Sequence, residues 1–135
     1  MRLFGVPKGV YFNSFEYILV GDEVYIGPGV CITTANHDLM DPALPQRPEP
    51  IVIGHHSWIG ANAVILPGVR LGPHTVVGAG AIVTHSFPEG HVVIAGNPAK
   101  KIAKIHAERY GHRVIGELGI AFSYDFRGSP PKAKP

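Results

Sequence analysis

Aliphatic residues recur at every sixth position through the middle of the chain. Written in blocks of six from residue 53, the sequence reads IGHHSW, IGANAV, ILPGVR, LGPHTV, VGAGAI and VTHSFP. The second position of a block is glycine in four of the six blocks. A period of six matches neither the 3.6-residue turn of a helix nor the simple alternation of a strand, so it indicates one small unit stacked on itself. The first position is aliphatic in every block: Ile53, Ile59, Ile65, Leu71, Val77 and Val83.

The repeat predicts an all-β solenoid. Each block is expected to form a short extended segment and a bend that glycine permits, with one aliphatic side chain pointing inward. Three successive blocks then make one triangular coil, which stacks Ile53 on Leu71, Ile59 on Val77 and Ile65 on Val83. Residues 20–37 follow the same columns, and Val6, Phe12 and Ile18 extend them upstream with a two-residue slip at Leu19.

Residues 38–50 interrupt the repeat with the sequence DLMDPALPQRPEP. Proline cannot donate to a sheet ladder, so this segment with its four prolines is expected to leave the coil as an extruded loop. Loops longer than about 12 residues inside compact repeats usually serve binding or cover a site. We therefore expect a functional element here rather than a tolerated surface insertion.

After residue 97 the repeat ends, and the sequence favours a short helix. Pro98 suits the first helical position, where its missing N–H is not needed, and residues 99–109 are compatible with a helix that Gly111 would stop. We expect a β-helix over residues 1–97 and a C-terminal helix and tail over residues 98–135.

Composition and charge narrow the possible roles. A chain of 135 residues is one domain by length, and it has no apolar run long enough for a membrane span and no secretory start. Its single cysteine, Cys31, excludes an internal disulfide, so we expect a cytoplasmic protein. Residues 99–135 carry a net charge of +5 and the rest −3, which favours an anion such as a phosphate near the C-terminal end over nucleic acid.

The outward positions of the blocks suggest a partner subunit. Trp58, Val64, Val76 and Ile82 occupy the sixth column, which does not face the core. A thin prism with such apolar outer positions is expected to be one subunit of an oligomer.

His37 is the candidate for chemistry. It is the last coil residue before the proline-rich loop, and Asp38 and Asp41 follow it. A single histidine is more often structural than catalytic, but its position at the mouth of the loop raises the case for a functional role.

Four segments carry a resemblance to a known family. The NHD at residues 36–38, PIVIGHHSWIGANAVILPGVRLG, VVGAGAIVT and AGNPAKKI resemble the hexapeptide-repeat acyltransferases, most closely the O-acetyltransferases of sugars and polysaccharides such as maltose and galactoside acetyltransferases. The resemblance covers roughly residues 6–104. It implies a left-handed parallel β-helix, a homotrimer, and acetyl-coenzyme A in the cleft between two subunits, with no metal in the reaction.

The same resemblance assigns roles to individual residues. It implies that His37 is the general base, taking the proton of an acceptor hydroxyl during direct transfer without a covalent intermediate. His85 stands where the family often has a lysine, so Lys101, Lys104 or His85 itself is expected to share in phosphate binding. The residues expected to bind the coenzyme are Trp58, Ala61, Ala79, Thr84, His85, Lys100 and Lys101, and those expected to bind the acceptor are Asn13 and Asp38.

Two other functions fit the same solenoid. His37 and His55 are three blocks apart, as are His56 and His74, so stacked histidines from two subunits could bind zinc as in gamma-class carbonic anhydrases. Alternatively, the coils only oligomerise or present a surface. Metal analysis of the protein tests the first alternative, and a thermal-shift titration with coenzyme A tests the second.

Overall fold

The structure is a computed structural model that describes residues 7–108, 111–116 and 121–124. In these residues every regular element is a β-strand, and no helix is present that could cross a bilayer. The expectations for Val6 and for the C-terminal tail after residue 124 lie outside the described residues. The short strands of the stack are β1 (Tyr11–Asn13), β2 (Ile18–Val20), β3 (Tyr25–Ile26), β4 (Cys31–Thr33), β5 (Ile51–Ile53), β6 (Trp58–Ile59), β7 (Val64–Ile65), β8 (Arg70–Leu71), β9 (Thr75–Val77), β10 (Ile82–Val83) and β11 (Val92–Ala95).

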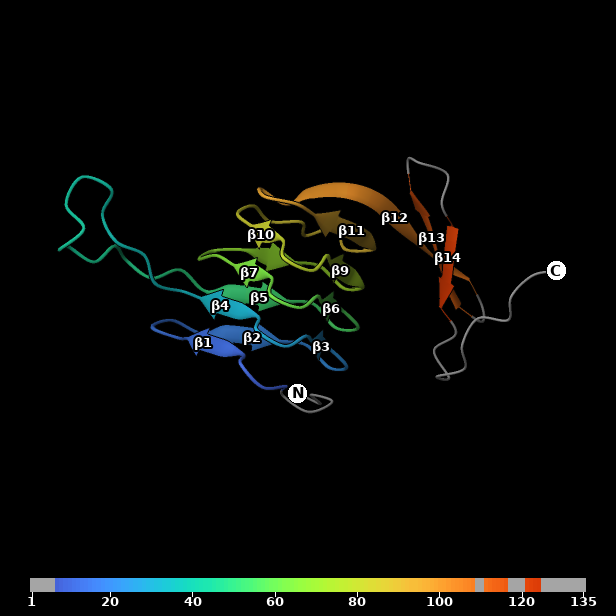
Figure 1. The fold of residues 1–135 in the computed structure, drawn as a ribbon, viewed down its shortest axis with the longest axis horizontal. Helices are drawn as coiled ribbons and strands as arrows, with labels where there is room; N and C mark the ends of the chain where they lie inside the picture. The colour runs from blue at the N-terminus through green and yellow to red at the C-terminus, as the bar shows by residue number, and fades with distance from the viewer. Residues whose placement is uncertain (1–6, 109–110, 117–120, 125–135) are drawn as a thin grey trace.

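These strands form three faces of a prism (Figure 1). One face is β1-β4-β7-β10, the second is β2-β5-β8, and the third contains β3-β6-β9-β11. All neighbours within these groups are parallel, and consecutive strands belong to different faces. The chain therefore winds around the prism as a parallel β-helix.

The predicted stacking of the coils is confirmed. Ile53 pairs with Leu71, Ile59 with Val77 and Ile65 with Val83, each in parallel register. All six side chains of the first column are at most 2% exposed. The six-residue period therefore reports the spacing of the core.

A second column is also buried, so the expectation of one inward residue per block was wrong. Positions five of the blocks are at most 1% exposed from Ser57 to Ala81, and Phe87 packs against the core. Each block turns a corner between its second and fifth positions, which brings both its first and its fifth side chain inside. The space beside a corner is narrow, and small or β-branched residues fill it: Ser57, Ala63, Val69, Thr75 and Ala81.

The second-column glycines are needed for close approach rather than for a bend with positive φ. A Cβ on Gly54 would lie 2.4 Å from the carbonyl carbon of Gly72, and one on Gly60 would lie 2.6 Å from the nitrogen of Ala79. Neither glycine has a positive φ. These residues allow the corners of successive coils to lie against each other.

The chain between β4 and β5 projects from the prism as an irregular hairpin (Figure 1). Its two limbs are joined by an antiparallel bridge between His37 and Pro45 and by backbone hydrogen bonds, including Gln46 N–H to Asn36 O at 3.0 Å. Glu49 N–H donates to Thr34 O at the base, also at 3.0 Å. The prolines occupy positions in these limbs without interrupting the parallel ladder.

The predicted C-terminal helix is wrong. After Pro98 the chain forms β12 (Lys100–Glu108), which runs antiparallel to β11 and is followed by β13 (Gly111–Gly116) and β14 (Ala121–Tyr124). Ala103 and Ile105 are buried, whereas Lys104 and His106 are exposed, which is the alternation of a strand. The unpaired edge of β11 needs a hydrogen-bonding partner, and this demand outweighs the local helix signals.

Candidate functional site

His37 lies on the outgoing limb of the hairpin, shortly after β4. Its side chain is exposed, and its backbone N–H donates to Asn36 Oδ1 at 3.0 Å. The bridge to Pro45 fixes the backbone at this point. The imidazole is therefore presented to solvent on a backbone that the second limb holds in place.

Asn13 lies beside the base of this hairpin. It pairs with Thr33 in the register of β1 and β4, and its carbonyl accepts the N–H of Thr34 at 2.9 Å. The buried Thr34 hydroxyl donates to the same carbonyl and accepts the N–H groups of Phe15 and Glu16 at 2.9 and 3.0 Å. Sequence reasoning missed Thr34, because it stands third in its block, outside the first and fifth columns that face the core.

Asp38 closes a turn within the loop. Its Oδ1 accepts the backbone N–H groups of Met40 at 2.8 Å and Asp41 at 3.0 Å. The hydrogen bond from Asp41 has the larger effect and that from Met40 the smaller. Both favour the ionised carboxylate and lower the pKa of Asp38 below its ordinary value of 3.8. Asp38, predicted to bind the acceptor, thus has one oxygen engaged in shaping the segment that carries His37.

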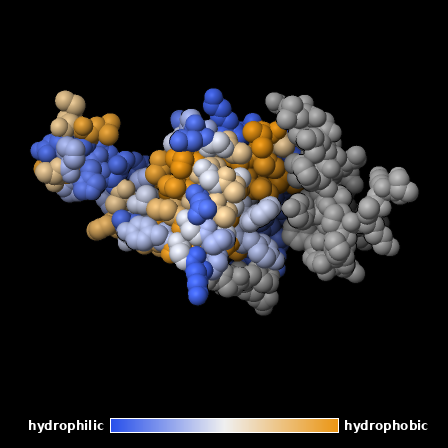
Figure 2. Space-filling model, viewed as in Figure 1, coloured by the Kyte–Doolittle hydropathy of each residue, from blue (hydrophilic) through white to orange (hydrophobic). Residues whose placement is uncertain are grey.

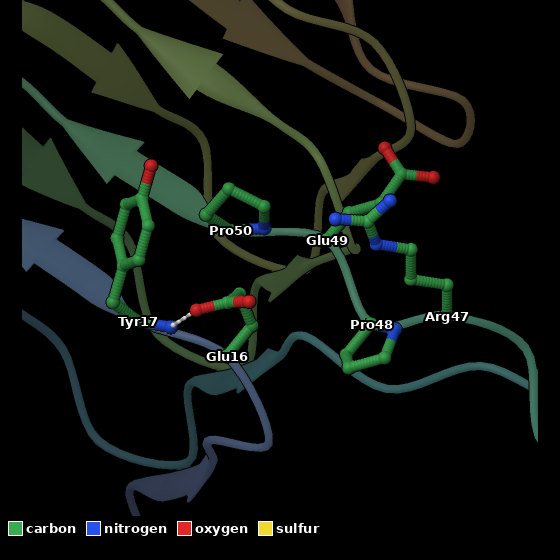
Figure 3. A pocket seen from close by; sticks show the side chains of 6 residues that line it. All are labelled: Glu16, Tyr17, Arg47, Pro48, Glu49 and Pro50. Carbon is green, nitrogen blue, oxygen red and sulfur yellow. Dashed lines mark hydrogen bonds between the residues drawn. The ribbon is translucent and has the colours of Figure 1, made fainter.

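A pocket of about 460 Å³ opens at the root of the hairpin (Figure 3). Tyr17 stands on one side of it, and the returning limb of the loop supplies the other side (Figure 3). Sequence reasoning missed this pocket because its two walls are far apart in the chain. Its lining residues are Glu16, Tyr17, Arg47, Pro48, Glu49 and Pro50.

The residues matched to the pantetheine arm lie on the third face and at its corner. Trp58 is 45% exposed on β6 and stands in register with Tyr25 and Val76. Ala61 and Ala79 occupy the same corner on successive coils, and the carbonyl of Ala61 accepts the N–H of Gly80 at 2.8 Å. The structure therefore brings Ala61 and Ala79 together in one ladder of small residues.

The residues matched to the distal part of the coenzyme gather near the last coil. Thr84 and His85 follow β10 and are joined by a contact of 2.7 Å between Oγ1 and Nδ1. The chain before Lys100 crosses β10, since the N–H of Ala99 donates to Ile82 O at 2.8 Å. Lys101 forms an ion pair with Glu89, with 3.7 Å between Nζ and Oε1. Lys100 and Lys101 are both exposed to solvent.

One chain does not unite all these residues. His37 and Asn13 belong to the corner after β1 and β4, whereas Trp58 belongs to the third face, on β6. In Figure 1 the hairpin projects on the opposite side of the prism from β3 and β6. The exposed imidazole of His37 can accept a proton, and Lys100 and Lys101 can attract an anion. In a single copy, however, His37 and Trp58 lie on different surfaces.

Of the two histidine pairs expected to stack in a zinc enzyme, one stacks and the other does not. The rings of His56 and His74 are stacked, with centroids 4.9 Å apart and an interplanar angle of 11°. His37 and His55 do not pair, because His37 follows β4 and His55 follows β5, which lie on different faces. The hairpin lengthens the chain between these two strands and so breaks the first register.

Comparison with known proteins gives one family and several relatives. Residues 50–85 match the family model described as bacterial transferase hexapeptide (six repeats). The galactoside O-acetyltransferase of Escherichia coli (strain K12) is 40% identical over 93 residues, which make up 66% of this chain and 45% of that protein. The chain spans about half the length of the curated relatives it matches.

Two solved structures share the fold. A hexapeptide-repeat-containing acetyltransferase from Vibrio cholerae O1 biovar eltor, complexed with acetyl-coenzyme A, is 33% identical with a TM-score of 0.69, over 73% of this chain and 55% of that one. A maltose O-acetyltransferase from Clostridium difficile 630 is 29% identical with a TM-score of 0.62, over 78% of this chain and 66% of that one.

Proposed function

We propose that this chain, a member of the bacterial transferase hexapeptide family, is an acetyltransferase. It moves an acetyl group from acetyl-coenzyme A to a hydroxyl of a sugar or polysaccharide acceptor. The names of its relatives support this activity, as does the complex of the Vibrio cholerae protein with acetyl-coenzyme A. The observation that carries the proposal is His37, held with an exposed imidazole on the hairpin of a coil stack.

His37 acts as the general base. A neutral imidazole takes the proton of the acceptor hydroxyl while its oxygen attacks the thioester carbonyl, and the proton then passes to the leaving thiolate. The carbonyl carbon–sulfur bond breaks as the ester bond forms, so no covalent enzyme intermediate is needed. Proton transfer from a positioned side chain contributes about 10²- to 10⁴-fold.

The third face and its corner hold the coenzyme. The exposed indole of Trp58 offers an apolar surface to the pantetheine arm, and the small side chains of Ala61 and Ala79 let the arm approach the backbone. At the far end, charge-assisted hydrogen bonds from Lys100 and Lys101 meet the phosphates. Thr84 and His85 line the same end of the stack, near β10.

Three copies form a left-handed β-helical trimer that completes the site. Because His37 and Trp58 lie on different surfaces of one chain, a neighbouring copy has to bring one to the other. The outer end of the extruded loop is apolar, with Leu39 87% and Met40 93% exposed, and Figure 2 shows hydrophobic atoms there. Such exposure is costly in water, and the outer face of a second subunit relieves it.

The acceptor enters at the root of the hairpin. Asn13 lies there, and the pocket beside it offers an aromatic ring from Tyr17 together with charged groups from Arg47 and Glu49. A flat aromatic face and several hydrogen-bonding groups suit the alternating apolar and polar surfaces of a sugar. The pocket and His37 share the same hairpin, so an acceptor hydroxyl can reach the base.

A panel of mono- and oligosaccharides incubated with acetyl-coenzyme A tests the proposal. We expect release of free thiol with at least one sugar acceptor, together with a mass increase of one acetyl group on that sugar. Binding of coenzyme A, measured by thermal shift, is the control for a folded donor site. Coenzyme binding without acetylation of any hydroxyl acceptor would contradict the assignment of the acceptor class, and absence of coenzyme binding would contradict the transferase itself.

A further inference from the structure

A column of histidines lines the corner between the second and third faces. Glu23, His56, His74 and His91 occupy equivalent positions on successive coils. The N–H of His56 donates to Asp22 O, that of His74 to His55 O and that of His91 to Pro73 O, at 2.9, 2.9 and 2.8 Å. The acetyl-transfer site proposed for this chain uses none of these four side chains.

The backbone at this corner adopts a conformation that normally favours glycine. His56, His74 and His91 have φ values of 57°, 53° and 52°. At comparable bends of the other corners, the left-handed residues are mostly glycines, Gly29, Gly68 and Gly80, together with Asn62. Keeping imidazole side chains where glycine is easier points to a use for the rings.

The rings of this corner converge. The His74 ring stacks on both His56 and His91, with centroids 4.9 and 4.8 Å apart. The His55 ring meets the same group edge-on, 5.0 Å from His56 and 5.5 Å from His74. One ligand nitrogen from each of His55, His56 and His74 lies within 4.8 Å of the other two.

The core beneath the rings is fixed by buried hydrogen bonds. Ser57 and Thr75, the residues after His56 and His74, are 0% exposed. The Ser57 hydroxyl accepts the N–H of Thr75 at 3.1 Å, and the Thr75 hydroxyl donates to Gly72 O at 2.8 Å. The two coils that carry the rings are therefore tied together from inside, as a preorganised ligand site requires.

Glu23 sets the proton position on His56. Its carboxylate lies 2.5 Å from His56 Nε2, and because a carboxylate only accepts, the Nε2 atom carries the hydrogen. The lone pair of a neutral His56 is then on Nδ1, which lies 2.8 Å from His55 Nδ1. A carboxylate behind a histidine whose other nitrogen faces a second histidine is the arrangement found around protein-bound metals.

We propose that His55, His56 and His74 bind one divalent transition-metal ion, of the imidazole-preferring class that includes Zn²⁺. Zn–N bonds of about 2.0–2.1 Å in tetrahedral geometry place two ligand nitrogens roughly 3.4 Å apart. The three nitrogens now lie within 4.8 Å of one another, so on binding the His56–His74 stack opens by side-chain rotation and both rings turn toward the ion. The ion replaces the hydrogen bond between the two Nδ1 atoms. It joins the corner before β6 to the corner before β9 and leaves one coordination position for water.

Titration of the metal-free protein with Zn²⁺, followed by calorimetry, tests this site. We expect one ion per chain, and we expect His55→Ala and His74→Ala each to weaken binding by more than about 100-fold, beyond the loss typical of an outer-shell change. Glu23→Gln should weaken it by about 10-fold through the tautomer of His56. The matched control is His85→Ala, which removes an exposed histidine outside the cluster and should leave the affinity unchanged.

Substitution with Co²⁺ gives a second readout that does not depend on affinity. Tetrahedral coordination produces intense visible absorption, and we expect it in the parent protein and in His85→Ala but not in His74→Ala. Circular dichroism of each variant confirms that the strands are retained, and Glu23→Gln, which keeps all three ligands, serves if an alanine variant fails to fold. Equal Zn²⁺ binding by all variants would show surface adsorption only and would overturn the proposal.

Discussion

Trp58 pairs in register with Tyr25, although the whole hairpin lies between them in the chain, whereas only three regular blocks separate Trp58 from its other partner, Val76. The hairpin thus lengthens one coil without shifting the parallel ladder. The prism and the loop are consequently separable: substitutions in the loop can alter His37 or the assembly while the coils persist.

Replacing His37 by alanine should reduce turnover at least about 100-fold, because the acceptor hydroxyl loses its positioned base. Thiol release from acetyl-coenzyme A measures the rate. Coenzyme A binding should persist, because the residues proposed to hold the coenzyme lie on other surfaces. His106→Ala, a change of an exposed histidine on β12, is the control and should leave the rate unchanged. Turnover of the His37 variant at the parental rate would show that another group is the base.

Replacing Trp58 by alanine should raise the dissociation constant for coenzyme A about tenfold. The half-exposed indole loses an apolar contact with the pantetheine arm, and a loss of about 1.4 kcal/mol corresponds to that factor. Calorimetry measures the affinity. Trp58→Phe retains much of the apolar surface and should recover most of it, whereas equal affinity of the alanine variant and the parent would place the arm elsewhere.

Replacing both Leu39 and Met40 by aspartate should dissociate the trimer and abolish transfer. The two exposed side chains form the apolar outer part of the loop, and carboxylates there would have to be buried unpaired against the neighbour. Light scattering after gel filtration reports the mass. Gln46→Asp, which adds a charge at an exposed position of the same loop, should remain trimeric. A stable, active trimer of the double variant would mean that the loop does not contact the next subunit.

Replacing Gly54 by alanine should destabilise the coils by about 3 kcal/mol, since the new Cβ would lie 2.4–2.5 Å from backbone atoms of Gly72 and Pro73 and force the two coils apart. Denaturant unfolding measures the loss. Gly80→Ala is the matched control: it has no atom within 4 Å of the new Cβ and only a φ of +70°, so it should cost about 1–2 kcal/mol. Equal losses in both would show that crowding between coils is relieved by backbone shifts.

The turn at Asp38 should open in acid. Its pKa is lower in the folded loop than its ordinary value of 3.8, so the carboxylate stabilises the folded turn above that value. This stabilisation is lost as the pH falls below 3.8 and through the folded pKa. Hydrogen exchange or amide chemical shifts of Met40 and Asp41 should report it. The same amides in Asp38→Asn should show no such transition, and an unchanged acid response would assign it to another group.

The core could be predicted from sequence because each of its residues repeats a local pattern. Ile59 and Val77 stand in the same column of the blocks and in the same stack of the structure. The signals around Pro98 misled because helix capping is local, whereas the need of β11 for a strand partner arises only in the folded stack. The alternation of buried Ala103 and Ile105 with exposed Lys104 was the available contrary signal.

Sites that depend on two distant segments were harder to predict. The three-block spacing of His56 and His74 predicted their stacking. Glu23 meets His56 across a coil that the hairpin lengthens, so spacing in the sequence did not predict this contact. The walls of the pocket, Tyr17 and Arg47, likewise meet only through the hairpin. Asn13 was singled out by resemblance, and His37 first by its place at the mouth of the loop and then by resemblance; the roles of both are still predictions.

β12 pairs antiparallel with β11 at the end of the prism, whereas the strands within the prism pair in parallel. A solenoid of identical blocks has no intrinsic length, since each parallel edge is a template for another coil or for a foreign strand. The antiparallel strand β12 covers the β11 edge of the third face, so a further parallel coil cannot pair with that edge. A truncation before Lys100 should therefore convert a molecule of defined size into one that polymerises end to end.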